Sequence, residues 1–169
     1  MGAGTSGRIA ALDAAECAPT FGVPPERVLV LLAGGKTAAA RAAEEAEDDR
    51  SAAVQDLEDL NLRPHDVVVG LAASGSTPYV VSAIRRASEL GCATVSISNN
   101  ADAELSGVAQ VAIEVVTGPE ILTGSTRLKA GTSQKLVLNM LSTTAFTCLG
   151  KVYGNFMVDL QASNEKLKR

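Results

Sequence analysis

The sequence predicts an α/β protein, a doubly wound parallel β-sheet with helices on both faces. Two observations support this fold class. Short apolar runs alternate with longer helical segments along the 169-residue chain, the order typical of strand–helix–strand units. The runs also lack the alternation of apolar and polar residues that marks a half-exposed strand, so we expect strands buried on both faces. No linker or internal repeat interrupts the pattern, and we expect one domain over residues 1–169.

Four apolar segments are expected to form the strands: residues 27–33, 66–73, 93–98 and, more weakly, 108–116. Glycine, serine or asparagine directly follows each of the first three, and these residues are typical of turns. In open parallel sheets, ligands bind at the carboxyl ends of the strands. The loops that follow these segments are therefore the first candidates for a functional site.

Helices are expected over the stretches between the strands. Residues 36–60 are rich in alanine and acidic residues, with a break near Asp49. Residues 77–90 begin with a Thr-Pro pair, which suits an N-cap and a first helical residue, and they stop before a glycine. Residues 125–149 form the longest predicted helix.

The chain begins with a glycine-rich loop, residues 2–7 (GAGTSG), which should follow a β-strand in this fold class. Only Met1 precedes it. In a strand–helix unit the missing strand would be a central one. We therefore expect the first central strand of the sheet to be missing and the sequence to begin inside a domain.

Composition and charge exclude several classes of partner. The net charge is −4 and provides no broad attraction for a polyanion, so no nucleic acid partner is expected. No apolar run reaches the ~18 residues of a membrane helix, and no membrane association is expected. Cys17, Cys92 and Cys148 are far apart and show neither a metal-binding spacing nor a disulfide framework. We expect a reduced, cytoplasmic setting with no metal and no cofactor.

The glycine-rich loop also fits the pattern G-x-G-x-x-G, which is weak evidence for a dinucleotide site when it stands alone. Such a site requires an acidic residue at the end of the next strand, and that strand ends in alanine and two glycines. The hydroxyls of Thr5 and Ser6 instead suit a phosphate at a helix N-terminus. The alternative is a plain strand-to-helix turn.

A second loop, residues 73–78, follows a predicted buried strand and opens a helix. Backbone N–H groups, the helix dipole and the hydroxyls of Ser74, Ser76 and Thr77 would all face one phosphate there. Hydroxyls without lysine or arginine suit a small phosphorylated metabolite. The alternative is that Ser76 or Thr77 merely caps the helix, but two such loops after two strands favour a phosphate site.

A third polar segment, residues 117–127, leads into the longest predicted helix. Glu120 is a candidate site carboxylate. Ser125 and Thr126 either contact a ligand or only cap the helix. Lys129 is equally a ligand contact or a solvated charge.

Few residues are available for acid–base or nucleophilic chemistry. His65 is the only histidine and stands beside a proline at a predicted turn, which argues against a Ser/His/Asp triad. Carboxylates are the remaining candidates. Glu16 ends the first predicted helix in an apolar setting, and settings of that kind move carboxyl groups toward neutral titration. The charge run over residues 44–49 has a solvated helix face as its default interpretation, and the pattern singles out none of its carboxylates.

Five segments resemble the family of etherases that cleave N-acetylmuramic acid 6-phosphate, within the sugar isomerase (SIS) domain superfamily. They are residues 2–22 (GAGTSGRIAALDAAECAPTFG), 43–49 (AEEAEDD), 66–84 (DVVVGLAASGSTPYVVSAI), 117–143 (TGPEILTGSTRLKAGTSQKLVLNMLST) and 150–167 (GKVYGNFMVDLQASNEKL). The resemblance extends over essentially the whole chain. Segments of this length are far more specific than a single glycine pattern.

The resemblance implies cleavage of the lactyl ether at C3 of the sugar, a step of cell-wall amino-sugar recycling that forms N-acetylglucosamine 6-phosphate and D-lactate. A base removes the C2 proton of the open-chain aldehyde, lactate leaves from C3 with help from an acid, and water adds back. The family's proton-donor glutamate corresponds to Glu16, in residues 13–20 (DAAECAPT), although two neighbouring residues differ. Its second glutamate corresponds to Glu47, in residues 44–48 (EEAED), as the C2 base.

Family members also carry a helical segment and a strand before the first glycine-rich loop, and they continue beyond residue 167 into a helical region. The resemblance therefore implies a chain truncated at both ends. Because the family's sites are built at a dimer interface, it also implies a homodimer that binds a sugar phosphate. Three alternatives stay open, namely a non-catalytic sugar-phosphate regulator, an aldose–ketose isomerase of the same superfamily, and an inactive fragment.

Overall fold

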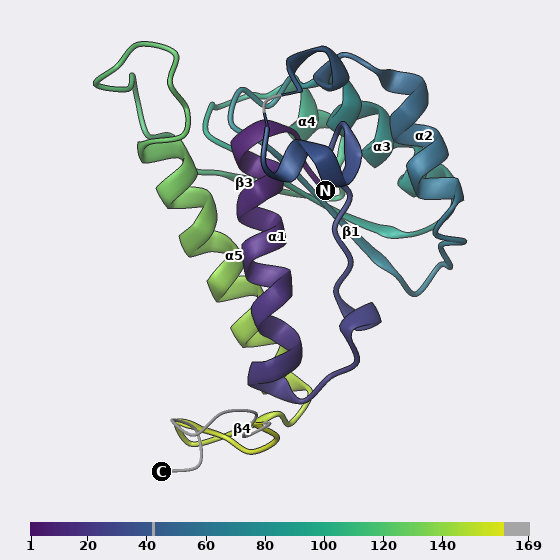
Figure 1. The fold of residues 1–169 in the computed structure, drawn as a ribbon, viewed down its shortest axis with the longest axis vertical. Helices are drawn as coiled ribbons and strands as arrows, with labels where there is room; N and C mark the ends of the chain where they lie inside the picture. The colour runs from purple at the N-terminus through teal and green to yellow at the C-terminus, as the bar shows by residue number, and fades with distance from the viewer. Residues whose placement is uncertain (42, 161–169) are drawn as a thin grey trace.

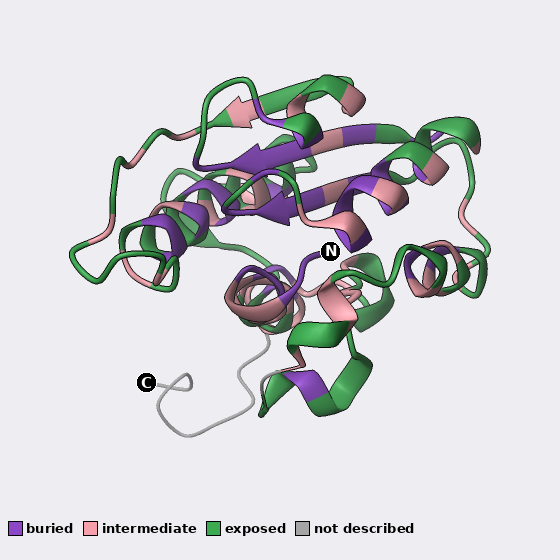
Figure 2. Cartoon of the chain, turned by 90° about the horizontal axis from the view of Figure 1, so that it is seen from above, coloured by how far each residue is buried: buried purple, intermediate pink, exposed green. Residues whose placement is uncertain are grey.

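The computed structural model describes residues 1–41 and 43–160 (Figure 1). Its centre is a parallel sheet of three strands in the order β1 (Val67–Ala72), β2 (Ala93–Ser98) and β3 (Val111–Glu114). The chain is seen from above in Figure 2, with buried residues concentrated on the strands and on the helix sides that face them. The predicted α/β fold with helices on both faces of a parallel sheet is confirmed.

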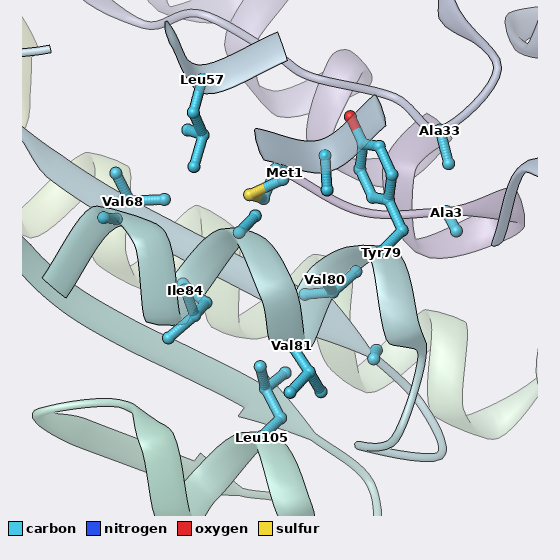
Figure 3. Close-up of a cluster of buried hydrophobic side chains, with 14 of the residues drawn as sticks. Met1, Ala3, Ala33, Leu57, Val68, Tyr79, Val80, Val81, Ile84 and Leu105 are labelled. Atoms are coloured by element: carbon cyan, nitrogen blue, oxygen red, sulfur yellow. The ribbon is translucent and has the colours of Figure 1, made fainter. Parts of the chain in front are cut away.

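The described chain forms five α-helices, α1 (Gly4–Phe21), α2 (Arg50–Glu58), α3 (Pro78–Glu89), α4 (Glu104–Val108) and α5 (Lys129–Cys148). α1 and α5 lie side by side on one face of the sheet, where Val137 joins Leu71 in an apolar cluster. On the other face, Ile84 and Leu105 join Val68 in the cluster that Figure 3 shows. Leu71 and Val68 both belong to β1, and their alternation along the strand directs them to opposite faces.

Three 3-10 turns and a small hairpin complete the described elements, η1 (Pro25–Arg27), η2 (Gly35–Ala39), η3 (Glu44–Glu47), β4 (Val152–Tyr153) and β5 (Phe156–Met157). β1 and β2 pair along their whole length and are buried over their carboxyl halves. They confirm the strands predicted over residues 66–73 and 93–98, and β3 forms within the weaker predicted segment 108–116. The loops after β1 and β2 therefore begin at a buried edge of the sheet.

The strand expected over residues 27–33 is reduced to a single β-bridge, so this prediction is wrong for most of the segment. Gly2 donates its N–H to the carbonyl of Leu31 (3.1 Å) and accepts the N–H of Ala33 (3.1 Å). A strand needs a hydrogen-bonded neighbour along its length. Within the described chain, only Gly2 pairs with this segment, so the ladder ends after those two bonds.

The first residues of the chain lie beside β1, along the edge of the three-stranded sheet that β2 does not cover. Gly2 bridges Leu71 of β1, and Leu71 donates its N–H to the carbonyl of Met1 (2.9 Å). This short segment therefore lies between β1 and residues 31–33, the place where the sequence predicts a central strand. Because α1 follows directly, its N-terminus is held at the carboxyl end of β1.

The helix expected over residues 36–60 forms only in its last part, as α2 after the predicted break. Asp49 caps α2, because its carboxylate accepts the N–H of Ala52 (2.9 Å). The earlier part forms η2 and η3 instead. Three alanine methyl groups crowd around Gly34, those of Ala38, Ala43 and Ala46. This close tertiary packing outweighs the helix propensity of alanine.

The helices predicted over residues 77–90 and 125–149 differ in how well the structure matches them. α3 begins at Pro78 as predicted, whereas α5 begins at Lys129 and not at residue 125. Ser125 and Thr126 therefore lie in the preceding loop and do not cap the helix. The last residues of the predicted family segment 150–167 lie outside the described residues.

Three structural findings concern membrane spans, metal sites and the cysteines. None of the helices in the described ranges is long and apolar enough to cross a membrane. Over the same residues, no three His, Cys, Asp or Glu side chains are grouped so that they could hold a metal ion. Cys17, Cys92 and Cys148 are free thiols, and the first two are buried.

Gly70 provides a test of the contact between β1 and α3. A Cβ at this position would lie 2.7 Å from Cγ1 of Ile84 and 2.9 Å from Cγ1 of Val80. We expect Gly70→Ala to push α3 away from the sheet and to lower the free energy of unfolding by about 1–3 kcal/mol, measured by urea denaturation. Gly107→Ala is the matched control, because nothing lies within 4 Å of the added methyl group. Equal losses in both variants would contradict this account of the packing.

Candidate functional site

A pocket of about 230 Å³ opens at the carboxyl end of β1, where four parts of the chain meet. Its walls come from the start of α1, the loop after β1, the turn η3 and the loop before α5. The polar and charged residues of these walls are Thr5, Ser6, Glu47, Ser74, Thr77 and Thr126. The structure therefore brings together the two hydroxyl-rich loops that the sequence singled out.

α1 and α3 both begin at this pocket without a side-chain cap. The residues at their N-cap positions are Ala3 and Thr77, and neither helix receives a capping hydrogen bond from a side chain. The alternative interpretation in which Thr77 merely caps α3 is therefore wrong. The first N–H groups of both helices, and the positive ends of their dipoles, are available to an anion.

The loop after β1 is held in shape by two sets of hydrogen bonds. Ser76 donates both its N–H and its hydroxyl to Oγ of Ser74 (3.2 Å each), so Ser74 lines the pocket while Ser76 supports it. Asn100, just after β2, donates its side-chain amide to the carbonyls of Ala73 (3.0 Å) and Ser74 (3.3 Å). The sequence pattern did not single out Asn100 as a residue that supports the site, although its place at a strand end was a usable signal.

A third helix N-terminus, that of α5, already holds a carboxylate. The two oxygens of Glu120 accept the N–H groups of Lys129 (3.0 Å) and Ala130 (2.9 Å). The backbone hydrogen bond from Ala130, with a smaller effect from Lys129, lowers the pKa of the Glu120 carboxyl. The ammonium of Lys129 donates to a loop carbonyl (2.8 Å). Glu120, Ser125 and Lys129 do not line the pocket, whereas Thr126 does.

Glu47 lines the pocket beside Gly4, at the N-terminus of α1. Gly4 has a φ of 50°, and a Cβ there would lie 2.9 Å from Oε1 of Glu47. Burial raises the pKa of the Glu47 carboxyl, the charges of Glu44 and Asp48 raise it further, and the charge of Arg8 opposes them. The acidic run is therefore more than a solvated helix face, because one of its carboxylates belongs to the pocket.

Glu16 does not lie near this pocket in the described chain. It is exposed, so the apolar setting expected from the sequence is not found. A helix rises about 1.5 Å per residue, which places Glu16 about 18 Å along α1 from Gly4. Glu16 and Glu47 of one chain therefore lie far apart.

A pocket between helix N-termini at the carboxyl edge of a parallel sheet is typical of α/β domains that bind phosphorylated ligands. The family model of the glucokinase regulatory protein N-terminal SIS domain matches residues 1–88. A phosphoheptose isomerase from Francisella tularensis has the same fold, with a TM-score of 0.62 and 16% identity over 86% of this chain and 74% of that one. The Vibrio vulnificus NanR protein complexed with ManNAc-6P has a TM-score of 0.59 and 18% identity, over 89% and 49%. The chain belongs to the SIS-domain family.

Its sequence is similar, at a much higher level, to N-acetylmuramic acid 6-phosphate etherases. It is 60% identical to the etherase of Geobacillus thermodenitrificans over 168 residues, which are 99% of this chain and 57% of that protein. It is 62% identical to etherase 2 of Lactiplantibacillus plantarum over 167 residues, with 99% and 56% coverage. The resemblance recognised in the sequence is confirmed. The chain spans about half the length of the curated relatives that it matches.

The raised pKa of Glu47 predicts a pH-dependent effect on stability. Folding raises this pKa above the ordinary value of 4.5, so the stability that Glu47 contributes is full below that value and is lost as the pH rises through the folded pKa. We expect Glu47→Gln to raise the melting temperature at pH 8 and to have little effect below pH 4. Glu45→Gln, on the exposed side of the same turn, is the control and should produce a smaller gain. A gain that is equal at both pH values would contradict the view that the ionised Glu47 carboxylate destabilises the folded chain.

Proposed function

We propose that this chain forms the sugar-phosphate site of an etherase that converts N-acetylmuramic acid 6-phosphate to N-acetylglucosamine 6-phosphate and D-lactate. The etherase relatives support this reaction, at about 60% identity over nearly the whole chain. The observation that carries the proposal is the pocket itself, in which two uncapped helix N-termini meet a carboxylate with a raised pKa. The three free thiols support a cytoplasmic location as part of the same proposal.

The phosphate binds between the N-termini of α1 and α3. Backbone N–H groups and the helix dipoles stabilise its negative charge, and the hydroxyls of Thr5, Ser6, Ser74 and Thr77 complete its hydrogen bonds. The pocket walls contain no lysine or arginine among the described residues. Recognition therefore depends on positioned dipoles and hydroxyls, which select a compact anion of defined geometry.

Glu47 acts as the base. In the open-chain sugar, the aldehyde acidifies the C2 proton, and Glu47 removes it. A carboxylate with a raised pKa is a stronger base than an ordinary one, and burial in a pocket is the usual way to obtain it. The lactate oxygen then leaves from C3 with a proton from an acid, and water adds to the resulting double bond.

Glu16 supplies that proton from a second copy of the chain. It is exposed on α1, far from its own pocket, so a homodimer is needed to bring it to a site. The outward sides of α1 and α5 expose the apolar side chains of Leu12, Leu136 and Met140. Exposed apolar surface of this kind is typical of an interface. A hollow of about 460 Å³ also lies on α5, lined by Leu136, Asn139, Met140, Thr143 and Thr144.

Phosphate recognition can be tested by binding alone. Ser74→Ala combined with Thr77→Val removes two hydroxyls from the pocket and should weaken N-acetylglucosamine 6-phosphate binding by about 2–4 kcal/mol in calorimetry. Ser88→Ala, at the exposed far end of α3, is the matched control and should bind normally. Unchanged affinity in the double variant would refute this phosphate site.

The shared site can be tested by mixing two inactive variants. Glu47→Gln should abolish solvent deuterium exchange at C2, and Glu16→Gln should slow lactate release more than C2 exchange, each by roughly 100-fold or more. A mixed dimer contains one pocket in which both glutamates are intact, so co-folding the two variants should restore on the order of a quarter of the turnover. No restoration would show that both glutamates act from one chain, and near-normal turnover of the single variants would refute both roles.

A second function, binding without catalysis, is favoured by one observation. The family model that matches residues 1–88 describes a domain of a regulatory protein. A regulator needs the phosphate pocket but has no chemical use for Glu47. Tight binding of the sugar phosphate without lactate release, unaffected by Glu47→Gln, would support this alternative.

A further inference from the structure

Arg8 lies one helical turn after Gly4 on α1 and contacts two parts of the site. Its Nη1 donates to the carbonyl of Ala38 in η2 (3.1 Å), and its Nη2 donates to the hydroxyl of Thr5 (3.5 Å). Both hydrogen bonds are partly buried. Arg8 therefore links a phosphate-pocket residue to the segment that continues to Glu47, although Arg8 itself does not line the pocket.

The segment that carries Glu47 has little regular structure of its own. η2 and η3 are short 3-10 turns, and neither has a side-chain cap. Turns of this kind have poorer hydrogen-bond geometry than an α-helix, so their position depends on tertiary contacts. The bond from Arg8 to Ala38 is such a contact, because it ties η2 to the rigid start of α1.

Glu47 also lies among like charges. Glu44 and Asp48, on its own turn, raise its pKa, while the positive charge of Arg8 lowers it. α3 packs against η3 as well, but the ionisable side chain in its first turn, Tyr79, is buried and donates to an aspartate of α2. Among the described residues, Arg8 is therefore the cation whose charge opposes those of the acidic turn.

We infer that Arg8 is the positioning residue of this site. It ties η2, on the segment that leads to Glu47, to the start of α1, and its positive charge favours the carboxylate form of Glu47. The inference rests on the proposed function, in which Glu47 removes the C2 proton. Arg8 acts through Glu47 and does not touch the substrate. The hydrogen bonds of Arg8 and its charge are separate contributions. Arg8→Gln removes both, whereas Arg8→Lys keeps the charge and loses the hydrogen bonds of the guanidinium.

Carbon-13 NMR titration of the glutamate carboxyls tests the charge without any turnover, and Glu47→Gln assigns the signal. Arg8→Gln should shift the Glu47 titration to higher pH, because loss of a nearby positive charge disfavours the carboxylate. Arg8→Lys keeps the charge but loses the planar guanidinium, so the titration should stay near that of the unmodified protein. Both variants should accelerate amide hydrogen exchange over residues 35–41 and 43–47.

Arg41→Gln is the matched control, because it removes the same charge from an exposed position on the same segment. It should change neither the titration nor the exchange. An unchanged Glu47 titration in Arg8→Gln, or an equal shift in Arg41→Gln, would overturn the inference.

In turnover, the acid limb of the kcat/KM profile should move to higher pH in Arg8→Gln but not in Arg8→Lys. Arg8→Lys should instead lower kcat. If the protein releases no lactate while the titrations behave as expected, the proposed reaction fails and the link between Arg8 and Glu47 holds.

Discussion

The backbone of Gly2 makes the hydrogen bonds on which the rest of this structure depends. Its N–H and carbonyl pair with Leu31 and Ala33, and the carbonyl just before it accepts the N–H of Leu71 in β1. A Cβ on Gly2 would lie 2.8 Å from the nitrogen of Gly7, so the chain turns directly from the sheet into α1 at close range. These contacts bring the start of α1 to the carboxyl edge of the sheet, beside the loop that opens α3. The pocket exists because both helices begin at the same edge.

The ligand that the pocket suits depends on which helix N-termini have no side chain to accept their free N–H groups. In the described chain, α1, α3 and α5 all begin around the pocket, and each begins with N–H groups that no helical carbonyl can accept. Glu120 satisfies those of α5 from within the chain, whereas α1 and α3 have no side-chain cap. The proposed phosphate site is therefore at α1 and α3 and not at α5. Proximity to a helix end alone would have suggested all three.

Glu47 shows a conflict between stability and chemistry. Its carboxylate is partly buried beside two like charges, an arrangement that a purely structural role would not favour. Gly4 leaves room for its oxygen, and Arg8 supplies the opposing charge. Glu16, in contrast, is exposed on α1. The proposed base at the pocket and the proposed acid on the surface fit a site that two chains complete together.

The sequence by itself determined the strand–helix–strand order over residues 66–98, the two hydroxyl-rich loops and the family, because these depend on local pattern and on long matching segments. β1, β2 and the start of α3 formed where the pattern predicted them. Only the tertiary structure decided where each candidate carboxylate lies. The sequence offered Glu16, Glu47 and Glu120, and in the structure Glu47 lines the pocket, Glu120 accepts N–H groups at the start of α5 and Glu16 faces solvent. The physical reason is that burial, helix-end hydrogen bonds and nearby charges arise from residues far apart in the chain, which only folding brings together.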